Sequence, residues 1–272
     1  MRLLRPALGI AVVWLSVLAS TVAAQPRPLV FGVLNQQSPT LTAERWNPIL
    51  HYLSTVSGVP LALRMGPTVE DTDAMMGRGE MDFVFTNHNF QPEFDGIGYR
   101  VIARWAGDPI RCVIAVRVDS AITTLKGLEG ARVGFPSRDA FVAYAVPKLA
   151  LKQAGVKVQE VFGANQEGVL AQLKARRVDA GAVNSRFLTH YAEREGVKFR
   201  EVFVSDGYPD LAVIVHPRVP APVVERVRRA LLEMRSDPAA VAVLERARSQ
   251  GFVAATDRDY EGVRRVYRQI EP

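Results

Sequence analysis

The chain contains a single cysteine, Cys112, among 272 residues, and only four histidines. One cysteine excludes a disulfide-stapled fold and any structural zinc site built from several thiolates. The histidines are far apart in the sequence and form no His-x-x-x-His pair, so we expect no resident metal and no cofactor. The G-x-S-x-G elbow, the P-loop and a G-x-G-x-x-G turn after a strand are missing as well. We therefore expect no catalysis, with a secreted hydrolase kept as an alternative.

The chain also has little excess charge of either sign. Lys and Arg number 34 against 28 Asp and Glu, which gives a formal net charge of +6. The basic residues are spread along predicted helices and form no block with interleaved aromatic residues, which argues against a nucleic-acid partner. With 48% hydrophobic and 23% charged residues, the composition is typical of a globular protein and excludes a disordered chain.

The one long apolar run lies at the start of the chain. Two arginines precede the uncharged stretch 7–19, and small residues follow it up to Ala24. A positive end, a short apolar run and an A-x-A-like site are typical of a secretory signal peptide, so we predict that residues 1–24 are cleaved after Ala24. A membrane anchor is the alternative, but the run is shorter than the roughly 20 residues that a span needs. The mature protein is then expected in a periplasm and not embedded in the membrane.

Short apolar runs alternate with helical patterns along the rest of the chain. This alternation predicts an α/β protein with parallel sheets and helices on both faces. Two such stretches, joined by extended segments, predict two lobes. We expect residues 25–112 to form the first part of lobe 1, 113–205 to form lobe 2, and 206–272 to return to lobe 1. Ser38 and Gly58 are expected to start and end a first helix, and another helix is expected over 139–154. The last 50 or so residues are expected to be helical throughout, in the segments 221–234, 238–249 and 258–270.

Polar turns follow five of the predicted strands, where open α/β sheets bind their ligands. These turns are 35–38, 86–89, 136–139, 163–167 and 184–186. Three of them open a helix, and the unpaired N–H groups of a helix start favour a small anion. From the turns we take as candidate ligand contacts Gln36, Asn87, Ser137, Asn165 and Asn184. The alternative is that residues such as Ser137 and Asn165 only cap helices.

Four segments carry a resemblance to a known family. They read FGVLNQQSPTLTAERWNPILHYLS, GRGEMDFVFTN, DSAITTLKGLEGARVGFPS and NQEGVLAQLKARRVDAGAVNS. Their order and spacing resemble the periplasmic phosphate-, phosphite- and phosphonate-binding (PhnD-like) substrate-binding proteins of ABC transporters, over roughly residues 29–267. The resemblance implies a type II periplasmic binding protein, with two α/β lobes, a two-strand hinge and an oxyanion in the cleft. It implies as partner a membrane permease or, for the family's sensory relatives, a sensor histidine kinase.

The resemblance also implies site residues by position. Thr86 and Asn87 match the cleft-facing loop of the first lobe. Ser137 begins the stretch where phosphonate binders have Ser-Thr-Ser-Gly, and Arg138 stands in place of the threonine. Gln166 occupies a position at which the family often has a histidine that contacts the ligand.

Two further positions depart from or match the family pattern. Arg186 replaces a glutamate that resembles the amine-recognising residue of aminophosphonate binders, and Asp210 matches an acidic cleft position. Losing an acceptor for an ammonium group argues against an aminoalkyl phosphonate, whereas an arginine can bind an oxyanion through two parallel hydrogen bonds. The alternative is that Arg138 and Arg186 point into solvent.

Cys112 lies in the apolar stretch 110–118, which we place at or near the hinge. A small buried hydrophobic residue is the commonest fate of a free cysteine. The resembling family includes arsenite-binding sensory proteins in which a cysteine near this position is important. Because a thiolate suits a soft trivalent arsenic centre, ligand contact by Cys112 is kept as an alternative.

Overall fold

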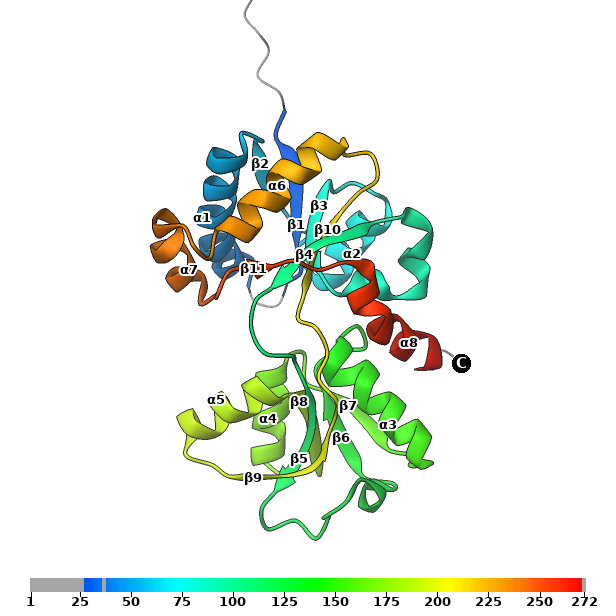
Figure 1. Cartoon of the computed structure of the whole chain (residues 1–272). Helices are drawn as coiled ribbons and strands as arrows, with labels where there is room; N and C mark the ends of the chain where they lie inside the picture. The colour runs from blue at the N-terminus through cyan, green and yellow to red at the C-terminus, as the bar shows by residue number, and fades with distance from the viewer. Residues whose placement is uncertain (1–26, 36–37, 271–272) are drawn as a thin grey trace, which may run out of the picture.

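Two mixed β-sheets, one above the other in Figure 1, form the cores of two lobes. This computed structural model describes residues 27–35 and 38–270. The predicted signal peptide and Gln36 lie outside these residues. No helix among those described is long and apolar enough to span a membrane. The predicted α/β class with two lobes is confirmed.

Lobe 1 is built on a six-stranded sheet with the order β11-β4-β10-β3-β1-β2. Its strands are β1 Leu29–Val33, β2 Leu61–Arg64, β3 Phe83–Thr86, β4 Arg100–Trp105, β10 Ala212–Val215 and β11 Phe252–Val253. Its helices are α1 Pro39–Ser57, α2 Val69–Gly77, α6 Ala221–Glu233 and α7 Val241–Ala247, with short turns η1 His88–Phe90, η2 Pro92–Ile97, η5 Pro238–Ala240 and η6 Asp257–Tyr260. Helix α1 starts as its sequence predicts, since Ser38 caps it ahead of Pro39 and Gly58 ends it with a φ of +65°.

Lobe 2 is built on a five-stranded sheet with the order β7-β6-β8-β5-β9. Its strands are β5 Cys112–Arg117, β6 Arg132–Phe135, β7 Gln159–Phe162, β8 Ala180–Asn184 and β9 Phe199–Val204. Its helical segments are η3 Leu125–Leu128, η4 Phe141–Ala145, α3 Val146–Ala154, α4 Gln166–Lys174 and α5 Ser185–Glu195.

The sheets are mixed, although the sequence predicts parallel ones. Besides β11, which is antiparallel to β4 at one edge of lobe 1, one interior strand in each lobe runs opposite to the parallel strands: β10 in lobe 1 and β5 in lobe 2. These are the strands by which the chain enters a lobe from the other one. Because the parallel strands end at the boundary between the lobes, a strand that begins there must run the opposite way.

Two segments, 106–111 and 205–211, carry the chain between the lobes. They pair with each other at Ile110 and Tyr208, whose backbone N–H groups each donate to the other's carbonyl at 2.8 Å. This pairing forms the expected two-strand hinge. Cys112, directly after the first segment, already belongs to the sheet of lobe 2.

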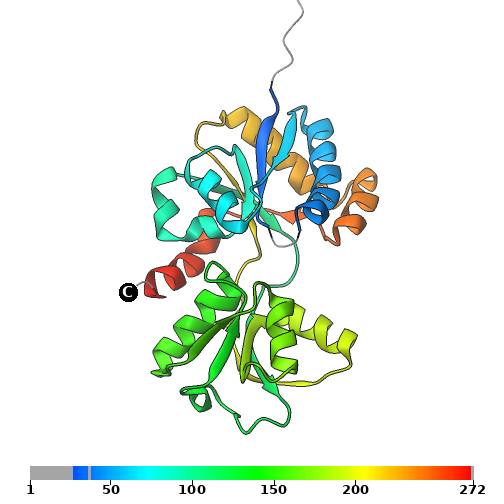
Figure 2. The same ribbon diagram turned by 180° about the vertical axis from the view of Figure 1, so that it is seen from behind.

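The last helix, α8 Glu261–Ile270, joins the lobes a third time. Figures 1 and 2 show it beside the boundary between the lobes, away from α5 and α7. At its start, Tyr260 stacks on Phe90 of lobe 1 with ring centroids 4.4 Å apart, and Tyr267 packs on Phe141 of lobe 2 at 5.3 Å. The lobes therefore share an apolar core on this side.

Two predicted helices differ in the structure. The helix expected over 139–154 begins with a π-helical turn, η4, and becomes regular only at α3. Ala140 offers no capping side chain and Pro147 has no N–H to donate, so the regular pattern is interrupted here. The C-terminal region is not helical throughout, because β11 pairs with β4 and places Phe252 against Trp105, with ring centroids 5.5 Å apart.

Candidate functional site

A cavity of about 570 Å³ lies between the two lobes. Its walls include residues that follow β1, β3, β6, β7 and β8, which are the five strand ends singled out in the sequence. Their lining members are Asn35, Ser38, Asn87, His88, Pro136, Ser137, Ala164, Asn165, Gln166, Glu167, Asn184 and Arg186. The hinge contributes Ile110, Asp210 and Leu211. The polar turns of the two lobes thus meet in one space.

Three amide side chains of lobe 2 present their donor ends to this cavity. The Oδ1 atom of Asn165 accepts the N–H of Gly168 at 2.8 Å, and the Oε1 atom of Gln166 accepts the N–H of Asn184 at 2.6 Å. The Oδ1 atom of Asn184 accepts the N–H of Arg186 at 3.0 Å. Since a backbone N–H can face only the oxygen of an amide, these bonds fix which end is which. The three NH₂ groups have no hydrogen-bond partner among the described residues.

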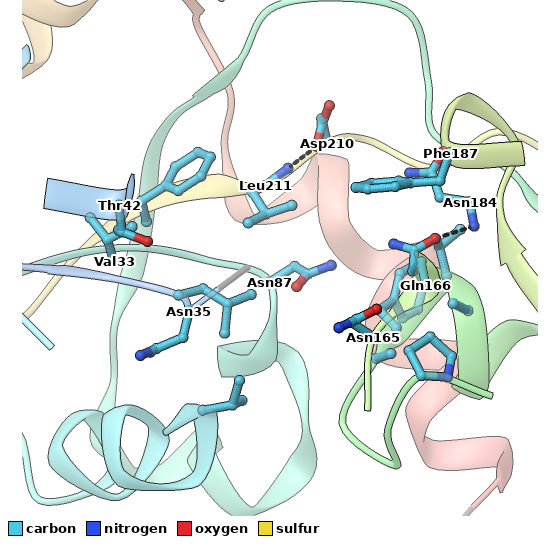
Figure 3. A pocket seen from close by; sticks show the side chains of 18 of the residues that line it. Val33, Asn35, Thr42, Asn87, Asn165, Gln166, Asn184, Phe187, Asp210 and Leu211 are labelled. Carbon is cyan, nitrogen blue, oxygen red and sulfur yellow. Dashed lines mark hydrogen bonds between the residues drawn. The ribbon is translucent and has the colours of Figure 1, made fainter. Parts of the chain in front are cut away.

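Asn87 and Ser137 line the same cavity, and their side chains make no hydrogen bond with the described residues. Asn87 is only 6% exposed, yet its amide makes no hydrogen bond within the part of the chain that is described. Ser137 caps no helix, because the cap position of η4 is Ala140. Figure 3 shows Asn87 extending from lobe 1 toward Asn165 and Gln166 of lobe 2. A buried polar group without a protein partner is stabilised when a ligand or water supplies one.

Asn35 lines the cavity, but both ends of its side-chain amide are hydrogen-bonded within lobe 1. Its Nδ2 atom donates to the carbonyl of Gly66 at 2.9 Å, and its Oδ1 atom accepts from Thr72 at 2.5 Å. Its role is therefore to tie the end of β1 to the start of α2.

Arg186 and Asp210 form an ion pair at the hinge. Arg186 Nη1 lies 2.9 Å from Asp210 Oδ2, and its Nη2 atom donates to the carbonyl of Asp108. One guanidinium at the start of α5 therefore contacts both crossing segments. The second oxygen of Asp210 accepts the N–H of Leu211 at 2.9 Å (Figure 3). Because each charge offsets the other, the pair adds little net charge to the cavity.

Three predicted site residues, Thr86, Arg138 and Cys112, do not line the cavity. Thr86 is buried beneath it, and its hydroxyl oxygen accepts the N–H of His88 at 3.0 Å. Arg138 is 70% exposed and lies over the ring of Phe162, 5.0 Å from its centroid, with Glu160 3.7 Å away. The aromatic face and the carboxylate hold this guanidinium outside the cleft. The structure therefore agrees with the alternative stated for Arg138, that it points into solvent.

Cys112 also lies away from the cavity. Its side chain is fully buried in the core of lobe 2, and this burial raises the pKa of the thiol. A buried neutral thiol is a poor ligand for arsenic, because the thiolate is the species that binds. The structure therefore favours the interpretation of Cys112 as a small core residue.

Among the lining residues that sequence reasoning missed, four can contribute charge or an exposed ring: Arg45, His88, Phe187 and Arg248. His88 belongs to the turn 86–89, so its neighbour Asn87 was the available signal. Its Nδ1 atom lies 2.7 Å from Asp73 Oδ2. Burial alone would lower the pKa of His88, but the attraction and hydrogen bond of the Asp73 carboxylate prevail and raise it. Arg45 and Phe187 lie on helix faces, and Arg248 ends a helix; the sequence does not reveal what these positions face.

The acidic residues in the cavity wall are paired with arginines. Glu167 forms an ion pair with Arg194, and Asp210 with Arg186. No group of three His, Cys, Asp or Glu side chains within residues 27–35 and 38–270 could hold a metal ion. The polar groups that lobe 2 turns toward the cavity are therefore mainly neutral N–H and O–H donors, which suit a solute rich in acceptor oxygens.

Solved structures share this two-lobed fold. PhnD1 from Prochlorococcus marinus, in complex with methylphosphonate, is 17% identical with a TM-score of 0.75, over 90% of this chain and 99% of that one. XAC2383 from Xanthomonas citri, bound to chloride, is 19% identical with a TM-score of 0.76, over 89% and 96% of the two chains.

A curated relative has a second kind of role. The tetrathionate sensor histidine kinase TtrS of Salmonella typhimurium is 25% identical over 237 residues. The match covers 74% of this chain and only 38% of that protein. The chain thus resembles one part of a longer signalling protein.

The family assignment rests on most of the chain. Residues 31–260 match the family described as ABC transporter, phosphonate, periplasmic substrate-binding protein. The resemblance found in the sequence is thereby confirmed. This chain belongs to the family of periplasmic substrate-binding proteins of phosphonate ABC transporters.

Proposed function

We propose that this chain is a periplasmic solute-binding protein that captures a small oxyanion of the phosphonate or phosphite type between its lobes. The observation that carries the proposal is the orientation of Asn165, Gln166 and Asn184, whose oxygens are all held by backbone N–H groups. Their NH₂ groups are left to face the cavity together with Asn87 and Ser137. Such a surface offers donors to an oxyanion and little to an ammonium group.

Helix starts add to this preference. Helices α4 and α5 begin at Gln166 and Ser185, so the positive ends of both dipoles lie at the cavity. A bound anion that contacts both lobes stabilises the closed arrangement over the open one, and only this difference in affinity can drive closure. In the transport role, a membrane permease recognises the closed form. The export signal predicted in residues 1–24 belongs to this proposal.

The second candidate is a ligand-binding subunit of a sensor kinase system. The similarity to the tetrathionate sensor histidine kinase of Salmonella typhimurium supports it, since the matched part is a minority of that protein. Tetrathionate, a dianion rich in acceptor oxygens, would suit the donor surface of the cavity. In this role the partner is a histidine kinase and no solute is passed on.

Calorimetric titration of the mature chain tests the binding step. The ligands are phosphate, phosphite, methylphosphonate, sulfate, tetrathionate, arsenate and arsenite. We expect at least one oxyanion to bind without turnover. We also expect the double variant Asn87→Ala, Ser137→Ala to lose at least about tenfold in affinity, because two donors to a charged group are removed. Asn47→Ala, an exposed change on α1, is the matched control. Unchanged affinity in the double variant would remove both residues from the site.

Deleting the gene separates the two roles. In the transport role, uptake of the bound anion falls. In the sensor role, uptake persists and the transcriptional response to the anion is lost.

A further inference from the structure

Two arginines form a second positive region of the cavity, which we name the arginine pole: Arg45 of α1 and Arg248 at the end of α7. Neither guanidinium has a hydrogen bond or a carboxylate within 4.0 Å among residues 27–35 and 38–270. Arg186, by contrast, is neutralised by Asp210. The arginine pole is thus the place in this cavity where positive charge is uncompensated.

The arginine pole belongs to lobe 1, whereas the amide donors Asn165, Gln166 and Asn184 belong to lobe 2. Residues Ser38, Leu41, Thr42, Arg45 and Trp46 line the cavity with the spacing of one helix face. Helix α1 begins at the boundary between the lobes, just after β1, and runs back along the sheet of lobe 1 (Figure 1). Seven residues separate Ser38 from Arg45, which corresponds to about 10 Å along the helix axis. This length of cavity wall is longer than a single phosphonate group.

Apolar side chains from both lobes line the cavity as well. Trp46, Phe85 and Trp105 pack together, with Phe85 4.6 Å from Trp46 and 4.8 Å from Trp105 between ring centroids. Leu41 of lobe 1 and Phe187 of lobe 2 also line the cavity, and they are 46% and 47% exposed. Figure 3 shows the ring of Phe187 directed into the cavity. Exposed large apolar side chains on two facing walls suit an uncharged part of a ligand.

The cavity is larger than one oxyanion requires. Its 570 Å³ correspond to roughly 19 water molecules at about 30 Å³ each. A methylphosphonate, with five non-hydrogen atoms, would leave most of this space to water.

We propose that the ligand is an elongated dianion with an anionic group at each end and an uncharged middle. This inference rests on the proposed function and narrows its substrate class. One end binds the amide and hydroxyl donors of lobe 2, the middle lies against Trp46, Trp105 and Phe187, and the other end binds Arg45 and Arg248. The middle can be a short carbon chain or a chain of sulfur atoms, since both are uncharged and polarisable.

Matched ligand pairs test the proposal by calorimetric titration. Butylphosphonate and butane-1,4-diphosphonate share a four-carbon chain and differ in the second anionic group, while sulfate and tetrathionate compare one sulfur oxyanion with two that are joined by a chain of sulfur atoms. The variants are Arg45→Gln and Arg248→Gly. Arg248 has a φ of +51°, so glycine removes the guanidinium without straining the turn. The control is Arg246→Gln, an exposed change on α7 outside the cavity.

We call a ligand two-ended if it has an anionic group at each end and one-ended if it has a single anionic group. We expect a two-ended ligand to bind at least about tenfold more tightly than its one-ended partner, because one additional charge-assisted hydrogen bond contributes about that much affinity. This advantage should fall in Arg45→Gln and Arg248→Gly and persist in Arg246→Gln, with unchanged melting temperatures. The pair that shows the advantage identifies the middle as carbon or sulfur. Equal binding of both members, or an advantage that survives both variants, would overturn the elongated dianion and leave the proposed function standing if one-ended anions bind. Absence of binding by all four anions would overturn the elongated dianion, and failure of phosphate, phosphite and methylphosphonate as well would overturn the proposed function.

Discussion

Replacing Gln166 by glutamate separates the stability of the site from its affinity for anions. In the folded protein the Oε1 atom of Gln166 accepts the N–H of Asn184 at 2.6 Å, while its NH₂ group faces the cavity. Gln166→Glu keeps the accepting oxygen and has nearly the same shape. It changes only the atom that faces the cavity, from a donor to a negatively charged acceptor.

The two effects of this substitution have opposite signs. Gln166 is the first residue of α4, where a negative charge is favourable by about 0.3–1 kcal/mol, so the free energy of unfolding should be kept or slightly raised. For an anion about 4 Å away, repulsion at an effective dielectric constant of about 20 costs about 4 kcal/mol. Water in the cleft screens part of this, but even about 2 kcal/mol weakens binding roughly 30-fold.

Urea unfolding and calorimetric titration on the same sample measure both effects. The control is Gln153→Glu, which makes the same charge change at an exposed position of α3. We expect affinity to fall roughly 30-fold to 1,000-fold in Gln166→Glu, with the control within about twofold of the parent. Unchanged or tighter anion binding would refute the donor surface on which the proposed function depends.

Three further results follow from the described contacts. The pKa of His88 is raised above its unfolded value of about 6.5, so its pairing with Asp73 stabilises the fold fully below about pH 6.5 and fades as pH rises through the folded pKa. His88→Gln should therefore lower the free energy of unfolding more at pH 6 than at pH 9. An equal loss at both pH values would contradict this pairing. Cys112 should resist a thiol reagent in native protein, with or without arsenite, and react in urea; Cys112→Ala should keep anion affinity, so a loss would return the thiol to the site. Arg186→Gln leaves the buried carboxylate of Asp210 without its ion-pair partner and should cost about 1–3 kcal/mol in urea unfolding; no loss would mean that the hinge does not depend on this pair.

The alternation of apolar runs and capped helices was enough to predict the lobes and most helix boundaries. Local chemistry decides these features, as the Ser38 cap and Gly58 stop of α1 show. Strand direction was not predictable in the same way. The antiparallel direction of β5 and β10 follows from where the chain crosses between lobes, which is a property of the whole topology. Likewise β11 has only two residues, too few for a periodic pattern.

The candidate site was predictable to the extent that strand ends determine it. Asn87, Ser137, Asn165, Gln166 and Asn184 all lie at the carboxyl end of a strand or within four residues of it, and these strand ends meet at the boundary between the lobes. Arg138 was assigned to the cleft by position alone, because no sequence pattern shows that a neighbouring Glu160 and Phe162 attract a side chain elsewhere. The arginine pole was missed for the opposite reason. Arg45 sits on a helix, where core-facing and cleft-facing positions have the same spacing, and Arg248 lies in the turn that ends another.

The balance between neutral donors and arginines bears on how the cleft selects its ligand. A buried, unpaired guanidinium is costly without an anion, whereas an amide donor loses less when water takes the place of ligand. Placing amides in the interior therefore lets the empty cleft stay open to water without a large electrostatic penalty. The exposed Arg248 keeps its hydration until a ligand arrives, and so can attract a dianion from solution at little cost to the empty state.

Raising the salt concentration should therefore slow the association of a two-ended anion more than that of a one-ended one. Arg248→Gly should remove most of that difference in stopped-flow measurements, and an unchanged salt dependence would show that the arginine pole does not guide the ligand.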